Sequence, residues 1–427
     1  MRTVDEHRAA VAALLQPTPI EERTLADALG LVLAEDLRAA IALPPFDNSA
    51  MDGYAVRAAD VAEATAAHPV WLPVPEDIPA GRTDSPPLRP GTAHRIMTGA
   101  PVPPGADAVV QVEHTDGGVT RVRVDRPAAA GTHLRRAGED THAGALVLPV
   151  GTPLTPARLG LAAAVGVATV RVRRPPNVLV LSTGSELVAP GQPLEHGQIY
   201  ESNGVMLAAA VRDAGGRAEQ LRFVPDDVTQ FLATLTNRIA KATADGAPPD
   251  LLLTSGGVSA GAYEVVKDAL ADRGVEFVRV GMQPGGPQGA GRLSGLDAGT
   301  GLRAEAAAGD GADYRGVAVV TLPGNPVSSQ VSFEVFVRPA LRAAMGHPSP
   351  DRPVVRARLS ETLRSPLGRR QFRRGEYDPV AGTARTVGGP GSHLLSALAR
   401  ANCLIVLNEE TELHPEGEIV DVWILDR

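Results

Sequence analysis

Thr254-Ser255-Gly256-Gly257-Val258-Ser259 lies between the leucine run 251–253 and residues 264–270, whose apolar spacing predicts a helix. A buried strand, a turn of small residues and a helix start are together typical of an anion site. Glycines let the backbone come close, free N–H groups point at the ligand, and the helix dipole favours negative charge. We therefore expect this turn to bind a phosphate group.

Two further turns of similar composition follow apolar runs. Ser182-Thr183-Gly184-Ser185-Glu186 comes after residues 178–181, and Leu322-Pro323-Gly324-Asn325-Pro326 comes after residues 317–320. In open α/β sheets, ligands bind at the carboxyl ends of parallel strands. The sequence therefore predicts that these turns lie together and bind a phosphorylated ligand.

Length and composition narrow the class of protein. A chain of 427 residues is too long for one core, and about two to four compact units are expected. The formal net charge of −8 argues against a general nucleic-acid-binding protein. The single cysteine, Cys403, excludes a disulfide framework and lies in an apolar run typical of a core strand. No signal-peptide pattern and no stretch of ~18 apolar residues is present, so we expect a cytoplasmic protein without a membrane partner.

The order of the predicted elements divides the chain into domains. Residues 174–346 alternate between strand and helix patterns, which predicts an open, mostly parallel α/β sheet. A glycine- and alanine-rich stretch at 289–316 interrupts them and is expected to be a hairpin or insertion. Residues 46–145 and 347–427 carry short apolar runs between turn residues, which predicts two β-rich domains, the first a small barrel or sandwich. The expected fold class is therefore multidomain α/β.

An acidic loop opens the first β-rich domain. Asp47 and Asp52 lie in residues 44–56, which begin with two prolines, and such a loop can present carboxylates rigidly. The alternative is an ordinary turn in which Asp47 and Asn48 bond only their own backbone. Composition alone leaves both interpretations open.

Five motifs stand in the order typical of one family. They are residues 45–55 (Pro-Phe-Asp-Asn-Ser-Ala-Met-Asp-Gly-Tyr-Ala), 96–100 (Ile-Met-Thr-Gly-Ala), 182–184, 255–259 and 322–328. Together they resemble the molybdopterin molybdenumtransferase family (MoeA type), which is similar to the C-terminal domain of gephyrin. The resemblance runs from about residue 1 to residue 427.

This resemblance implies an enzyme of molybdenum cofactor biosynthesis. Such an enzyme hydrolyses adenylylated molybdopterin with Mg²⁺ and inserts molybdate, which yields molybdenum cofactor and AMP. The resemblance also implies an elongated homodimer whose first subdomain is discontinuous, here residues 1–45 with 146–173. An upstream molybdopterin adenylyltransferase and apo-molybdoenzymes or their chaperones are the implied partners, with no nucleic acid and no membrane.

The same resemblance implies site residues, and Asp52, Thr98 and Asp140 would approach the site from the partner subunit. The implied catalytic residues are Asp52, Thr98, Asp140, Glu186, Asp227 and Glu264. The implied metal ligands are Asp52, Asp140 and Glu186. The implied substrate-binding residues are Thr183, Gly184, Ser185, Ser255, Gly256, Gly257, Val258, Ser259, Pro284, Pro287, Gly324, Asn325, Pro326 and Ser392.

The chain departs from the family pattern at basic positions. Gln283 and Gly286 stand where the family commonly has lysines that would face phosphate or molybdate. Arg279 or Arg292 would supply the missing charge, or the chain is a low-activity paralogue or a scaffold. A further alternative, a molybdopterin adenylyltransferase, fits less well because stand-alone adenylyltransferases resemble only the 177–345 unit.

Overall fold

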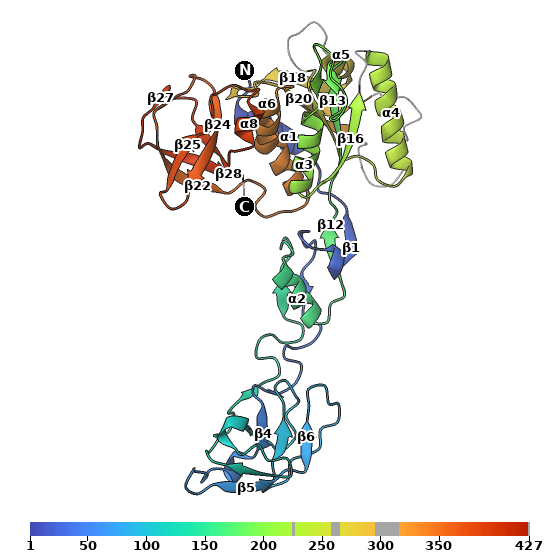
Figure 1. The fold of residues 1–427 in the computed structure, drawn as a ribbon. Coiled ribbons are helices and arrows are strands. Elements are labelled where there is room, and N and C mark those ends of the chain that lie inside the picture. Colours follow the sequence, from blue (N-terminus) through green and yellow to red (C-terminus); the bar gives the residue numbers. More distant parts are fainter. Residues whose placement is uncertain (224–226, 258–264, 295–315, 426–427) are drawn as a thin grey trace.

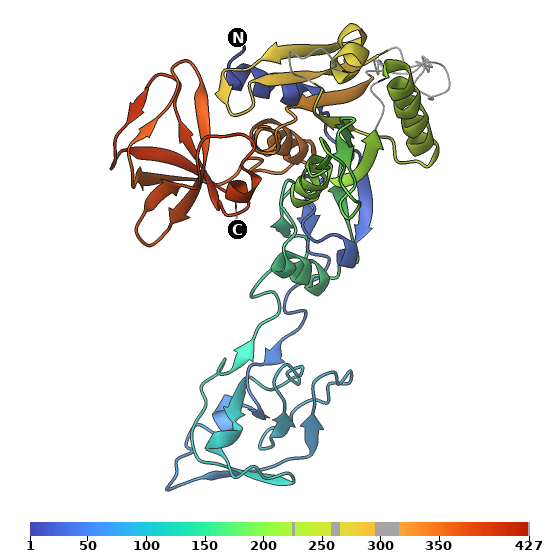
Figure 2. The same cartoon turned by 45° about the horizontal axis from the view of Figure 1, so that its top comes forward.

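The computed structural model describes residues 1–223, 227–257, 265–294 and 316–425. The molecule is elongated, with a β-rich domain at one end and the α/β and C-terminal domains side by side at the other (Figure 1). A narrow connection between the two ends contains β1 and β12, which come from distant parts of the sequence (Figure 2). The expected elongated, multidomain α/β fold is confirmed.

The α/β domain is built on a six-stranded sheet with the order β16-β13-β17-β21-β20-β18. Strands β13, β16, β17 and β21 are mutually parallel. At one edge of the sheet, β20 runs antiparallel to both of its neighbours, β21 and β18. The bounds are β13 Asn177–Thr183, β16 Arg217–Phe223, β17 Leu251–Ser255, β18 Val275–Arg279, β20 Pro287–Leu293 and β21 Val317–Leu322. The alternation of patterns along the sequence thus predicted a mostly parallel sheet correctly.

Strand β20 corrects one expectation from the sequence. The sequence predicts an insertion at 289–316, but residues 289–293 belong to β20, where 289–291 pair with β18 and 289–293 pair with β21. Glycines serve close packing here: a Cβ on Gly289 would lie 2.1 Å from Thr321 Oγ1, and one on Gly291 would lie 2.0 Å from Gly274 O. Residues 295–315 lie outside the described part of the chain.

Helices cover both faces of this sheet. Phe231, Leu235 and Ile239, spaced four apart on α4, pack with α5 against one face. On the other face lie α1, α3 and the continuous segment α6–η5–α7, whose middle is a π-helical turn. The bounds are α1 Val4–Leu14, α3 Asn203–Asp213, α4 Val228–Ala244, α5 Val265–Leu270, α6 Pro326–Ser332, η5 Phe333–Val337 and α7 Arg338–Ala344.

The connection and the first β-rich domain have separate apolar cores. In the connection, β1 (Ile20–Thr24) pairs with β12 (Thr169–Arg173), beside helix α2 (Pro156–Ala164). The β-rich domain has a sheet with the order β6-β7-β4-β8 and a separate pair, β5 with β9. The bounds are β4 Gly53–Val56, β5 Val70–Pro73, β6 Glu76–Ile78, β7 His94–Ile96, β8 Ala108–Gln111 and β9 Arg121–Val124.

The C-terminal domain is a small barrel, because β24 pairs with both β25 and β26 and closes the sheet. Strand β19 (Met282–Gln283) of the α/β domain pairs with β24 and joins the two domains. The bounds are β22 Val354–Leu359, β24 Arg370–Asp378, β25 Thr383–Thr386, β26 Cys403–Leu407, β28 Ile419–Ile424 and α8 Leu395–Leu398. Among the described helices, none is both long and apolar enough to cross a lipid bilayer.

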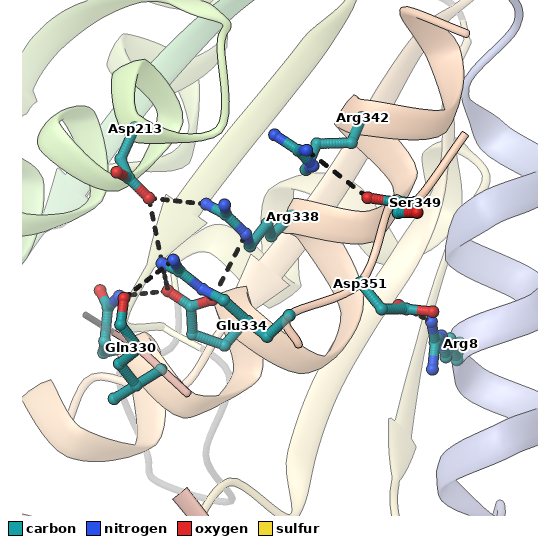
Figure 3. Close-up of polar contacts among 10 residues, drawn as sticks. Arg8, Asp213, Gln330, Glu334, Arg338, Arg342, Ser349 and Asp351 are labelled. Atoms are coloured by element: carbon teal, nitrogen blue, oxygen red, sulfur yellow. Dashed lines mark hydrogen bonds and ion pairs between the residues drawn. The ribbon is translucent and has the colours of Figure 1, made fainter. Parts of the chain in front are cut away.

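A buried ion cluster links the α/β domain to the start of the C-terminal domain (Figure 3). The Glu334 carboxylate accepts from Arg352 Nε at 2.8 Å and lies 3.9 Å from Arg338 Nε. Both arginines also contact Asp213 Oδ2, at 2.6 Å from Arg338 and 3.0 Å from Arg352. The side chains of Glu334, Arg338 and Arg352 are only 2%, 3% and 8% exposed, whereas that of Asp213 is 59% exposed.

His7 on α1 is a buried histidine that should make the fold sensitive to acid. Its ring packs edge-on against Phe336, and neither ring nitrogen has a hydrogen-bond partner. Burial, with a smaller contribution from Arg2, lowers the pKa of His7 from 6.5 to about 4. Because the folded state binds this proton less tightly than the unfolded state, the contribution to stability is full above pH 6.5 and is lost as pH falls towards 4.

We expect the free energy of unfolding to drop by about 2 kcal/mol between about pH 7.5 and about pH 5 through this group alone. Replacing His7 with leucine should remove that part of the pH dependence, as measured by urea denaturation at both pH values. His196→Leu, at an exposed position, is the matched control and should keep the wild-type pH dependence. An unchanged pH dependence in His7→Leu would contradict the prediction.

Candidate functional site

The turns that follow β13, β17 and β21 contact one another at the carboxyl edge of the sheet. Gly256 N donates to Leu322 O at 3.0 Å, which joins the second turn to the third. A Cβ on Gly256, whose φ is +94°, would lie 3.1 Å from Thr183 O, so glycine is needed where the first two turns meet. A Cβ on Gly324 would lie 3.5 Å from Gly256 Cα. The expected meeting of strand-end turns is confirmed.

These turns form one wall of a cavity of about 1130 Å³. Every residue expected to bind substrate lines it, where the structure describes that residue. These are Thr183, Gly184, Ser185, Ser255, Gly256, Gly257, Pro284, Pro287, Gly324, Asn325, Pro326 and Ser392. Val258, Ser259 and Glu264 lie outside the described residues. Glu186, also on the wall, folds back towards its own turn, since a Cβ on Gly184 would lie 2.5 Å from Glu186 Oε2.

Another part of the cavity wall comes from the C-terminal domain. Ser392 and the exposed side chains of Arg369 and His393 line the cavity there, and Ser392 O accepts from Val327 N at the start of α6, at 3.1 Å. Arg374, which is buried on β24, donates to the carbonyls of Gly389 and Gly391 and so supports this loop. The cavity therefore depends on how the α/β and C-terminal domains pack together, which they do through a shared apolar cluster and the pairing of β19 with β24.

One basic residue, Arg279, lies beside the positions that depart from the family pattern. Arg279 lines the cavity, and its Cγ lies 4.0 Å from where a Cβ on Gly286 would be. Arg292 instead donates to the carbonyls of Leu14 and Gly316 and is not on the cavity wall. Gln283 lines the cavity and accepts from Gln371 Nε2 at 2.7 Å. Of the two arginines considered from the sequence, only Arg279 lies where it can compensate.

Sequence reasoning missed several wall residues, namely Glu201, Asn203 and Arg369. Glu201 and Ser202 directly precede α3, whose first residue is Asn203, and a polar cluster at a helix start was the available signal. Arg369 gave no local signal, because it reaches the cavity only through the pairing of β19 with β24.

Three of the expected acid and hydroxyl residues lie far from this cavity within one chain. Asp52, Thr98 and Asp140 belong to the β-rich domain at the other end of the molecule, where Figure 1 labels β4. Asp52 Oδ1 accepts from Thr98 N at 2.6 Å and from Thr98 Oγ1 at 2.8 Å. These hydrogen bonds, the backbone one foremost, lower the pKa of Asp52 and keep it ionised. Asp140 is exposed.

The acidic loop is held by contacts across the domain rather than by its own backbone alone. Asp47 accepts from Arg136 Nη1 at 2.6 Å and from Ala137 N at 2.8 Å, although Asn48 does bond locally to Phe46 O. Asp47 is therefore a structural anchor, and Asp52 is the carboxylate that the loop presents at the surface.

Asp227 has a local structural role. It is the N-cap of α4, where its carboxylate accepts from Gln230 N at 2.7 Å, and it is not on the cavity wall. A direct catalytic role for Asp227 stays a prediction.

The acids expected to hold a metal ion are not clustered within one chain. The described residues of a single chain contain no group of three His, Cys, Asp or Glu side chains close enough to hold a metal ion. The oxygens of Asp52, Asp140 and Glu186 are chemically suited to Mg²⁺, which prefers carboxylate and water ligands. Asp52 suits this role further, because both hydrogen bonds from Thr98 are accepted by Oδ1, so Oδ2 could bind a metal ion.

Comparisons with known proteins agree along the whole chain. Residues 2–166 match the MoeA N-terminal region (domain I and II), residues 179–343 a probable molybdopterin binding domain, and residues 356–425 the MoeA C-terminal region (domain IV). Molybdopterin molybdenumtransferase 2 of Mycobacterium tuberculosis is 52% identical over 100% of both chains. Molybdopterin molybdenumtransferase 1 of that organism is 38% identical over 100% of this chain and 99% of its own.

A solved structure of the molybdopterin biosynthesis MoeA protein from Pyrococcus horikosii has a TM-score of 0.76 and 31% identity, covering 100% of this chain and 99% of that one. Full-length relatives, three family models and a shared fold therefore support one assignment. The chain belongs to the molybdopterin molybdenumtransferase (MoeA) family.

Proposed function

We propose that this chain transfers molybdenum from molybdate to molybdopterin, with adenylylated molybdopterin as substrate and AMP as product. The cavity carries the proposal: its lining combines the three glycine-containing strand-end turns with two arginines, Arg279 and Arg369. Main-chain N–H groups in turns suit phosphate, and guanidinium groups suit phosphate and other oxyanions. A volume of about 1130 Å³ lies above the usual range of about 300–1,000 Å³ for small-molecule sites and suits a two-part ligand.

The β-rich domain supplies its residues from a second chain in this proposal. Asp52 and Thr98 lie at the far end of the molecule from the cavity, so they contribute to it only if the domain of one chain faces the cavity of its partner. A homodimer is therefore proposed, with Asp52, Asp140 and Glu186 as the residues that hold Mg²⁺. When bound, Mg²⁺ would neutralise charge on the phosphoanhydride and lower the pKa of a bound water.

Within this site, each group has a distinct task. The turns bind the phosphate groups and fix the pterin, and the arginines orient the oxyanions. The ionised Asp52 would hold the attacking water together with Thr98 Oγ1, to which it is already bonded. We further propose a cytoplasmic location, with a molybdopterin adenylyltransferase upstream and apo-molybdoenzymes or their chaperones downstream.

Release of AMP tests the proposal directly. Purified protein incubated with adenylylated molybdopterin, Mg²⁺ and molybdate should release AMP, and omission of either ion should stop the release. An adenylyltransferase would instead form adenylylated product from ATP and molybdopterin. Binding of molybdopterin without AMP release would indicate a scaffold, the alternative that neutral Gln283 and Gly286 favour.

Restoring a lysine at position 286 should strengthen oxyanion binding. Gly286 lines the cavity, and the atom nearest to a Cβ built there lies 3.6 Å away, so a side chain fits. One added charge-assisted hydrogen bond contributes ~1.5–3 kcal/mol, so Gly286→Lys should bind molybdate at least about tenfold more tightly by calorimetry. Gly286→Met, similar in length but uncharged, is the control. Unchanged affinity in Gly286→Lys would mean that position 286 does not face the ligand.

A further inference from the structure

Glu201 is a buried carboxylate at the end of α3 nearest the cavity. It is 3% exposed and lies on the cavity wall. Its Oε1 accepts from Ser182 Oγ at 2.9 Å and from Gly204 N at 2.5 Å, and its Oε2 accepts from Gln220 Nε2 at 2.9 Å. Gly204 leaves room for this network, because a Cβ there would lie 2.5 Å from Gln220 Nε2. Glu201 therefore ties the end of β13 to the start of α3.

Asn203, two residues later, ties the same helix start to the other turns. Its Nδ2 donates to Ser255 Oγ, after β17, at 2.9 Å and to Gly324 O, after β21, at 2.6 Å. Because a carbonyl can only accept, the contact with Gly324 fixes which end of the amide faces the turns. Together, Glu201 and Asn203 connect the strand-end turns through one short segment of chain.

The Glu201 carboxylate oxygens and the Asn203 amide nitrogen are already hydrogen-bonded within the protein, and the buried Asn203 Oδ1 has no partner among the described residues. The Glu201 carboxylate is satisfied by its three donors and by the helix start, so it does not depend on a ligand for its charge to be stabilised. The Asn203 amide nitrogen makes two short bonds to the turns. Both residues thus act on the ligand through Ser182, Ser255 and Gly324 rather than as groups that perform chemistry.

We propose that Glu201 and Asn203 are positioning residues that hold the turns at the spacing required to bind the pterin phosphate. This inference rests on the proposed function, because the ligand is the one assigned there. Loss of the Asn203 amide leaves Ser255 Oγ held only by its longer hydrogen bonds to Ser329 Oγ at 3.3 Å and to Pro323 O at 3.4 Å, and it removes the link to Gly324. The turns then lose their preorganised spacing, and ligand binding has to restore it.

Substitution of Asn203 tests this inference. Asn203→Asp places a carboxylate oxygen against Gly324 O, so the affinity for molybdopterin, followed by its fluorescence, should fall about tenfold to a hundredfold. KM for adenylylated molybdopterin should rise similarly while kcat stays within about threefold. Asn237→Asp, the same change at an exposed position of α4, should leave both unchanged. Wild-type affinity in a folded Asn203→Asp variant would overturn the inference.

A double-mutant cycle separates positioning from a general loss of structure. If Asn203 acts through Ser255, then Asn203→Ala combined with Ser255→Ala should bind molybdopterin about as tightly as the weaker of the two single variants. Fully additive losses would overturn the inference, and these alanine variants serve if Asn203→Asp does not fold.

Glu201→Gln should raise KM in the same way, with Glu195→Gln as the exposed control. Absence of AMP release by the wild-type protein would instead count against the proposed function, since molybdopterin binding is measured separately.

Discussion

Replacing Asp52 with alanine is expected to abolish AMP release while leaving molybdopterin binding largely intact. The carboxylate is exposed, ionised and fixed by two hydrogen bonds from Thr98, which is the state required of a metal ligand or a water-orienting group. Removing it should lower kcat by at least about a hundredfold, because interactions with the reacting water and the metal strengthen in the transition state. The molybdopterin Kd should stay within about threefold, since the turns that bind it belong to another domain.

Two further variants sharpen this experiment. Asp77→Ala removes an exposed carboxylate from β6 of the same domain, where its partner Arg95 is 3.8 Å away, and should keep full activity. Thr98→Val removes the hydroxyl donor while keeping the backbone donor, so it should lower kcat less than Asp52→Ala does. Near-normal AMP release by Asp52→Ala would remove this residue from the mechanism.

A mixture of two variants tests whether the site is shared between chains. If Asp52 of one chain serves the cavity of its partner, then Asp52→Ala and a cavity-defective variant such as Ser255→Ala should complement each other when mixed as heterodimers. One site in such a dimer would carry both intact elements. Failure of the mixture to exceed either variant alone would contradict the proposed exchange between chains.

The sequence predicted those features that depend on local signals. A leucine run followed by Ser255-Gly256-Gly257 is a strand that ends in a turn, and the alternation with helices places such turns at one edge of a sheet. Because β13, β17 and β21 are neighbours in the sheet, the turns that follow them are in contact. The cavity wall at Gly256 and Gly324 follows from these rules alone.

Features that depend on tertiary contacts could not be predicted from local sequence signals. Residues 289–293 are rich in small residues and resemble a loop, yet they form β20 because glycine permits the close approach of Gly274 and Thr321. Arg369 reaches the cavity only because β24 pairs with β19 from another domain. Glu334 gives a comparable case, since a charged residue on a helix predicts a solvent-exposed position, whereas its side chain is 2% exposed.

Glu334→Gln is expected to cause the largest loss of stability among changes outside the cavity. The substitution keeps the size of the side chain but leaves Arg338 and Arg352 buried with only the exposed Asp213 as a counter-charge. Removing one partner of a buried ion pair costs about 3–5 kcal/mol, because the remaining charge stays desolvated. Burial already lowers the pKa of Arg338, which shows how poorly its surroundings solvate the charge. Urea denaturation of both proteins measures the difference.

Two further variants test whether the buried, unpaired arginine charge causes the loss of stability in Glu334→Gln. Asp213→Asn removes a carboxylate from the same cluster, but its side chain is 59% exposed, so the loss should stay below about 1 kcal/mol. Glu334→Leu combined with Arg352→Met removes the pair together, and apolar replacement of a buried pair is often neutral or stabilising. The double variant should therefore be more stable than Glu334→Gln, although it departs further from the native sequence. If it is less stable, the cluster acts through hydrogen bonds such as that from Arg352 to Leu425 O rather than through charge neutralisation.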